Sequence, residues 1–220
     1  FANQHIQVLP EPIPEDPHPV RVLMVVEGTH DIKFLRRIST LLHTDDPTRP
    51  DLASMERNRE LIFLPISGHP QAWIRRLAPL GIPEFHLYDR EESPVTEQRQ
   101  QTVATINQRC CCRAVLTQKR SLENYLHPQA IQAIAGVALE YGDHDCVATV
   151  AAQKVFDSTH NDYSWKQLTR RAQVRLTNRI KHWLNTSAVE QMTLPLLQER
   201  DPDGEIISWL ETIGQLAETA

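Results

Sequence analysis

The sequence predicts an α/β fold, a parallel Rossmann-like sheet with flanking helices, followed by a helical C-terminal part. Short apolar runs rich in β-branched residues alternate with amphipathic stretches between residues 20 and 116. This alternation is typical of parallel strands joined by right-handed helical crossovers. No further strand is indicated after Leu116, where the apolar residues recur with helical spacing. We therefore expect a proline-rich leader at 1–19, an α/β domain at 20–128 and a helical region at 129–220.

Each element of the first half has its own signal. Residues 21–26 (RVLMVV) are almost continuously apolar, as in a strand buried on both faces of a sheet. Residues 31–42 place apolar side chains on one helical face, and Gly81 ends the helix that Pro70 begins. The expected elements are strands at 21–26, 61–64 and 84–88, helices at 31–42 and 70–80, and a loop at 44–58.

The second half has one more strand and then helices. Ser121 has the character of a helix N-cap, and Pro128 suits the first turn of another helix. The expected elements are a helix at 95–108, a strand at 113–116, and helices at 161–184, 188–199 and 205–216.

Composition excludes several classes of protein. The chain has 220 residues, a net charge of −5 and 40% hydrophobic residues, as in an ordinary globular protein. It lacks an apolar run of about 18 residues and a signal-like N-terminus, so we expect a cytoplasmic protein without a membrane span. Glycine-rich phosphate motifs are missing, which argues against a nucleotide-driven motor. Three of the four cysteines are consecutive, which does not suit a paired zinc site, so we expect reduced thiols.

Positive charge is concentrated in one predicted helix. Residues 163–189 contain six Lys or Arg and no Asp or Glu, so the rest of the chain carries −11. Arg171, Arg175 and Arg179 lie four residues apart and form what we call the arginine stripe. Like charges at this spacing repel each other unless an anion faces them. That anion is either a nucleic-acid backbone, which we favour, or an acidic protein surface, including this protein's own.

Acidic residues follow two of the predicted strands. Glu27 and Asp31 come after the first strand, and Asp89, Glu91 and Glu92 come after the third. Ligands of open α/β sheets bind beyond the carboxyl ends of the strands, where these side chains would meet. Converging carboxylates favour a hard divalent cation such as Mg²⁺. Taken singly, each acid also suits the first turn of a helix or a solvated surface.

Four segments resemble the Toprim family. Residues 25–31 (VVEGTHD) resemble its first motif, and residues 87–91 (LYDRE) resemble its second. Residues 65–68 (PISG) and 119–126 (KRSLENYL) resemble segments of the OLD-family nucleases within that group. The resemblance covers residues 20–128, about half of the chain.

The resemblance implies a nuclease that uses Mg²⁺ or Mn²⁺ to hydrolyse DNA phosphodiester bonds. It implies that Glu27 is the general acid or base and that Asp31, Asp89 and Glu91 bind metal with it. Glu123 is either a further metal ligand or an ordinary acid at a helix start. The residues expected to contact phosphate are Gly28, Ser67, Gly68, Lys119, Arg120 and the three arginines of the stripe.

Two departures keep an alternative open. Glu91 stands where the second motif usually has Asp, and the ATPase domain of complete OLD proteins is not in this sequence. The chain could instead be a Toprim module that binds nucleic acid or an ATPase partner without turnover. The sequence leaves several questions undecided. They are whether the substrate is DNA or RNA, whether one or both strands are cut, how many metals bind, which oligomer forms, and whether an ATPase domain precedes Phe1 or acts in trans.

Overall fold

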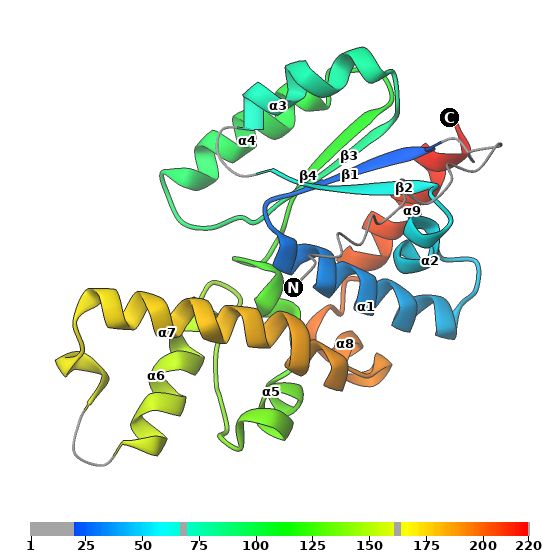
Figure 1. The fold of residues 1–220 in the computed structure, drawn as a ribbon. Coiled ribbons are helices and arrows are strands. Elements are labelled where there is room, and N and C mark those ends of the chain that lie inside the picture. The colour runs from blue at the N-terminus through cyan, green and yellow to red at the C-terminus, as the bar shows by residue number, and fades with distance from the viewer. Residues whose placement is uncertain (1–19, 67–69, 161–163, 220) are drawn as a thin grey trace, which may run out of the picture.

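Four strands form one all-parallel sheet in the computed structural model, which describes residues 20–66, 70–160 and 164–219 (Figure 1). The strand order is β2-β1-β3-β4, so β1 and β3 are central neighbours. Met24 of β1 pairs in register with Phe63 of β2 and Phe85 of β3. The sheet and its flanking helices confirm the α/β class. The strands are β1 (Val22–Val26), β2 (Leu61–Pro65), β3 (Glu84–Tyr88) and β4 (Cys112–Leu116).

Helices connect the strands and follow the last of them. Within the described residues, none of them is long and apolar enough to cross a membrane. The helices between strands are α1 (Thr29–Asp45), α2 (Leu52–Arg57), α3 (Pro70–Leu77) and α4 (Val95–Ile106). A 3-10 turn follows β4 at Leu122–Tyr125, and the later helices are α5 (Pro128–Ala135), α6 (Val147–Thr159), α7 (Arg170–Trp183), α8 (Leu194–Arg200) and α9 (Glu205–Glu218).

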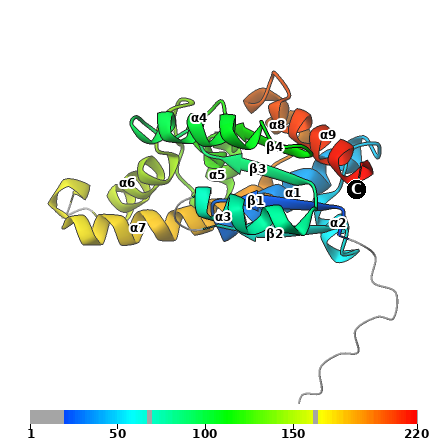
Figure 2. The same ribbon diagram turned by 90° about the horizontal axis from the view of Figure 1, so that it is seen from above.

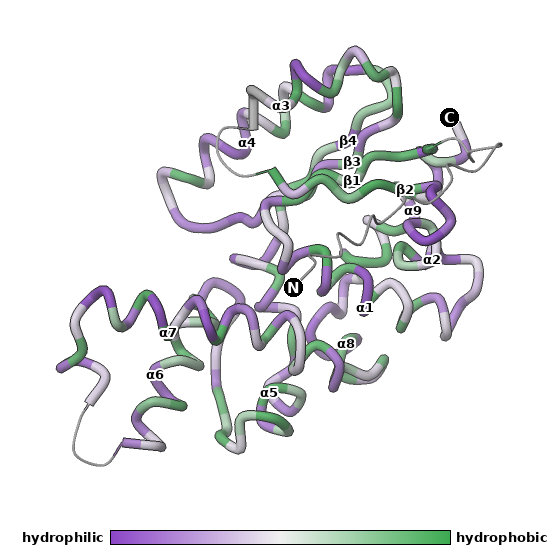
Figure 3. The backbone as a smooth tube through the Cα atoms, in the orientation of Figure 1, coloured by the Kyte–Doolittle hydropathy of each residue, from purple (hydrophilic) through white to green (hydrophobic). Residues whose placement is uncertain are grey.

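The two faces of the sheet have separate cores. Met24 and Phe85 pack with side chains of α1 and α9, whereas Val25 and Tyr88 pack with side chains of α3 and α4. This alternation explains why β1 is apolar without a break, as its green colour shows (Figure 3), whereas the other central strand, β3, also buries Glu84 and His86. It also means that residues following β1 and β3 emerge between two helical layers.

The C-terminal helices share the larger core with the sheet. Trp209 of α9 is only 3% exposed, and its ring lies 5.6 Å from that of Tyr125. By contrast, α6 and α7 project beyond the sheet in both views (Figures 1 and 2). The division at residue 128 stays a prediction.

Three expected elements differ from the structure. The helix expected at 188–199 is interrupted, because a 3-10 turn covers Val189–Gln191 and α8 begins only at Leu194. The segment 44–58, expected as a loop, contains α2, because the Asp51 side chain accepts a hydrogen bond from the Ala53 amide and Leu52 is fully buried. The helix expected from 161 begins instead at Arg170. Thr169 caps it by accepting a hydrogen bond from the Ala172 amide, and residues 161–163 lie outside the described part.

Candidate functional site

Two predicted acids meet at the carboxyl edge of the sheet because their strands are neighbours. Glu27 directly follows β1, and Asp89 directly follows β3. The Asp89 amide donates a hydrogen bond to Glu27 Oε1 at 3.2 Å. By strand alternation, however, Glu27 leans toward the α4 layer and Asp89 toward the α1 layer. Glu27 thus lies at the margin of the site rather than in its centre.

Asp31 joins Asp89 from the first turn of α1. Its Oδ2 accepts a hydrogen bond from the Gly28 amide at 2.8 Å, and the side chain is buried. This contact occupies the backbone N–H that we expected to face a phosphate. Gly28 has φ −152°, an extended conformation open to any residue, so the turn does not require glycine.

Glu123 belongs to the same group. Its carboxylate is almost completely buried in the 3-10 turn after β4, and Asn185 Nδ2 donates to its Oε1 at 2.6 Å. Its charge raises the pKa of both Asp31 and Asp89. Glu123 therefore lies within the electrostatic range of the two aspartates. We call Glu27, Asp31, Asp89 and Glu123 the acidic cluster.

The pKa values of the cluster reflect burial and mutual repulsion. Burial foremost raises the pKa of Glu27 to about 7, with Arg99 opposing and the charges of Asp31 and Glu91 adding to the rise. Burial likewise raises the pKa of Asp31 to about 6. The pKa of Asp89 lies well above its ordinary value, through burial and then the charges of Asp31, Glu123 and Glu27. The site is thus short of positive charge.

Two cations that we did not predict as site residues partly balance the cluster. Arg99 of α4 lies 2.6 Å from Glu27 Oε2 and also donates to the Asp89 carbonyl. Lys181 Nζ of α7 lies 3.5 Å from Glu123 Oε1. Burial alone would lower the pKa of Lys181, but Glu123, Asp89 and Asp31 raise it above its ordinary value. Both residues reach the site through tertiary packing, and no motif in the sequence marks them.

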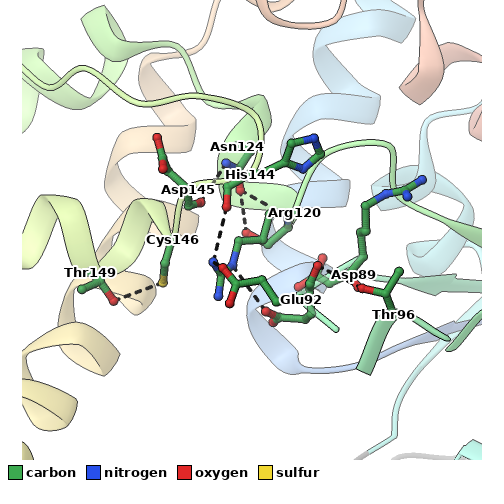
Figure 4. Close-up of polar contacts among 12 residues, drawn as sticks. Asp89, Glu92, Thr96, Arg120, Asn124, His144, Asp145, Cys146 and Thr149 are labelled. Atoms are coloured by element: carbon green, nitrogen blue, oxygen red, sulfur yellow. Dashed lines mark hydrogen bonds and ion pairs between the residues drawn. The ribbon is translucent and has the colours of Figure 1, made fainter. Parts of the chain in front are cut away.

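Glu91 and Glu92 turn away from the cluster toward Arg120. Glu91 has a left-handed backbone (φ 55°), and its Oε2 lies 3.5 Å from Arg120 Nε. Glu92 is 70% exposed and pairs with the same guanidinium, which also donates to the His144 carbonyl (Figure 4). The structure therefore places Glu91, an expected metal ligand, on the rim of the site.

Two of the residues expected to contact phosphate already form ion pairs within the protein. Arg120 is held by Glu91 and Glu92, and Lys119 Nζ lies 2.6 Å from Asp143 Oδ1. Both cations are therefore already paired. Ser67 and Gly68 lie outside the described residues.

The arginine stripe is exposed along α7. None of its guanidinium groups lies within 4.0 Å of a carboxylate in the described part of the chain, so the protein's own acidic surface is not their partner there. Lys181 follows Arg179 by two residues, about 200° around the helix, so the stripe and the cluster-facing lysine point to different sides. The apolar residues that recur every fourth position in this segment are half-buried at Leu168, Ala172, Leu176 and Ile180, whereas Leu184 is fully buried.

The donor set of the cluster suits a divalent metal. Within residues 20–66, 70–160 and 164–219, no three His, Cys, Asp or Glu side chains are already gathered to hold an ion. Four carboxylates facing Lys181 and Arg99 nevertheless leave two formal negative charges uncompensated when all are ionised. Asn185 adds a buried Oδ1 without a hydrogen-bond partner in the described structure. Oxygen ligands with an excess of negative charge are what Mg²⁺ and Mn²⁺ prefer.

Comparison with protein-family models, with curated proteins and with solved structures finds no match to this chain.

Proposed function

We propose that the protein is a Toprim nuclease that hydrolyses DNA phosphodiester bonds with Mg²⁺ or Mn²⁺. The observation that carries the proposal is the acidic cluster at the carboxyl edge of a parallel sheet. Burying several carboxylates together is costly for folding, as the raised pKa values of Glu27, Asp31 and Asp89 indicate. A protein retains such a group where its ligand supplies the missing charge.

Asp31, Asp89 and Glu123 would hold the metal, with Glu27 beside them. The bound ion would position a phosphate oxygen and activate the attacking water. Glu91, whose carboxylate lies at Arg120, would help to shape the rim and would bind metal only after leaving that ion pair.

The chain's own residues would supply the proton transfer and the phosphate contacts. Glu27, with a pKa of about 7, can accept and return a proton near neutral pH. Arg99 holds that carboxylate in place from the α4 side. Lys181 offers its charge to an incoming phosphate from α7, and the arginine stripe would bind a more distant part of the backbone.

The remaining partners belong to the same proposal. We expect DNA rather than RNA, a cytoplasmic location, and an ATPase domain or subunit or a second copy of the chain as protein partners. The DNA substrate and the ATPase partner follow from the resemblance to OLD-family nucleases.

A plasmid assay tests the proposal. We expect the protein to nick or linearise supercoiled DNA with Mg²⁺ or Mn²⁺ and not with EDTA, and Asp89→Asn to abolish cleavage. Glu140→Gln, which changes an exposed glutamate, is the matched control. Equal cleavage by Asp89→Asn and the unmodified protein would refute the proposed site.

A second function is favoured by the ion pairs of two expected catalytic groups. Arg99 holds Glu27, and Arg120 holds Glu91. A module that binds nucleic acid without turnover could keep both pairs permanently. Tight, salt-sensitive DNA binding with no cleavage in either metal would select this function.

A further inference from the structure

The turn between α4 and β4 presents two thiols as a pair. Cys110 and Cys111 are both exposed, and their Sγ atoms lie 3.3 Å apart. The other two cysteines differ, because Cys112 is buried at the start of β4 and Cys146 is half-buried elsewhere. The two accessible thiols of the chain therefore form one dithiol.

The backbone holds this pair together but opposes its closure into a disulfide. Cys111 has φ 55°, a left-handed conformation that glycine or asparagine adopts more readily than other residues. The Cα atoms of adjacent residues are about 3.8 Å apart across a trans peptide, whereas disulfides join Cα atoms about 4.4–6.8 Å apart. The pair is thus better suited to chelate one atom through both sulfurs.

We propose that Cys110 and Cys111 form a chelating site for trivalent arsenic that carries one organic group. Bonds from sulfur to a soft ion are about 2.3 Å long in zinc sites, and two such bonds spanning the 3.3 Å between the sulfurs enclose an angle of about 90°. That angle suits a pyramidal, three-coordinate centre better than a tetrahedral metal. The organic group fills the third position, because the adjacent Cys112 is buried.

The reaction needs no oxidant or reductant. Two S–H bonds and the As–O bonds of an arsenoxide break, two As–S bonds form, and the oxygen leaves with both protons as water. Arsenic stays trivalent throughout.

The site is independent of the proposed nuclease. The dithiol precedes β4, at the amino end of the sheet, whereas the acidic cluster lies beyond the carboxyl ends. At the same amino end, the buried Glu84 of β3 is fixed by Arg109 at 2.7 Å. Loading the dithiol should therefore leave metal binding at the acidic cluster unchanged.

Phenylarsine oxide tests the proposal on the full chain. We expect one adduct per chain, with a mass gain equal to the arsenoxide minus one water. A dithiol competitor should remove the adduct and an equal concentration of a monothiol should not. Cys110→Ser and Cys111→Ser should each weaken binding on the order of 100-fold, because each leaves a single thiol without chelation.

Cys146→Ser is the matched control and should bind as the unmodified protein does. Thermal unfolding of each variant, with Cys110→Ala as a second substitution, separates loss of the site from loss of the fold. Unchanged binding in the folded Cys110 and Cys111 variants would overturn the proposal. So would removal of the wild-type adduct by the monothiol as readily as by the dithiol.

Discussion

Neutralising Glu27 should remove much of the pH dependence of this protein's stability. The perturbation is Glu27→Gln, which keeps the shape of the side chain and resembles its protonated form. In the folded protein the pKa of Glu27 is about 7, against 4.5 for an ordinary glutamate. Between these two values the folded state binds more protons than the unfolded state.

The sign and size of the effect follow from this difference. Because the folded pKa is raised, the stabilisation is fully present below about pH 4.5 and is lost as the pH rises to about 7. Between pH 5 and pH 8 the unmodified protein should lose about 2.5 kcal/mol of unfolding free energy through Glu27 alone. Over the same pH range, the unfolding free energy of the Glu27→Gln variant should fall by that much less than that of the unmodified protein.

Urea unfolding in EDTA at pH 5 and pH 8, followed by the fluorescence of the buried Trp209, measures this difference. The exposed Glu140→Gln should keep the pH dependence of the unmodified protein. Adding Mn²⁺ should restore stability more at pH 8 than at pH 5, because metal competes with protons for the carboxylates. Equal pH dependence in Glu27→Gln and the unmodified protein would refute the argument that a half-buried carboxylate with a raised pKa follows β1.

Three further predictions concern the charges around the site. Lys181→Met should lower the unfolding free energy at pH 8 by roughly 1–3 kcal/mol, because it leaves Glu123 buried without its cation. The exposed Lys154→Met should leave the unfolding free energy unchanged, and urea unfolding of both variants measures the difference. Mn²⁺ should raise the melting temperature of Glu123→Gln less than that of Glu91→Gln, because Glu123 is buried in the cluster and Glu91 lies on the rim. An equal or reversed ranking of the two variants would contradict Glu123 as the main metal ligand. Charge reversal of the whole arginine stripe should flatten the slope of log K for DNA against log salt by roughly 0.7–0.9 for each phosphate that the variant no longer neutralises, as fluorescence anisotropy would show. The single charge reversal of the exposed Arg75 on α3 is the control there, and an unchanged slope in the stripe variant would point to a protein partner.

The sequence alone determined the sheet and the placement of its acids. The four strand-like runs predict a parallel sheet, and the unbroken apolar run of β1 indicates a strand covered on both faces, although β3 also buries Glu84 and His86. Once β1 and β3 are neighbours, Glu27 and Asp89 must emerge at the same edge. This local information was sufficient for the class of fold and for part of the acidic cluster.

Only the tertiary structure decided which charges complete the site. Arg99 and Lys181 come from α4 and α7, about 70 and 150 residues beyond Glu27, and ordinary helical periodicity describes both segments. The same holds for Glu91, which belongs to the second motif in sequence but has a left-handed backbone and pairs with Arg120. The physical reason is that sequence periodicity specifies which face of an element is buried. The partner that a charged side chain finds depends on how distant elements pack, and no local pattern encodes that packing.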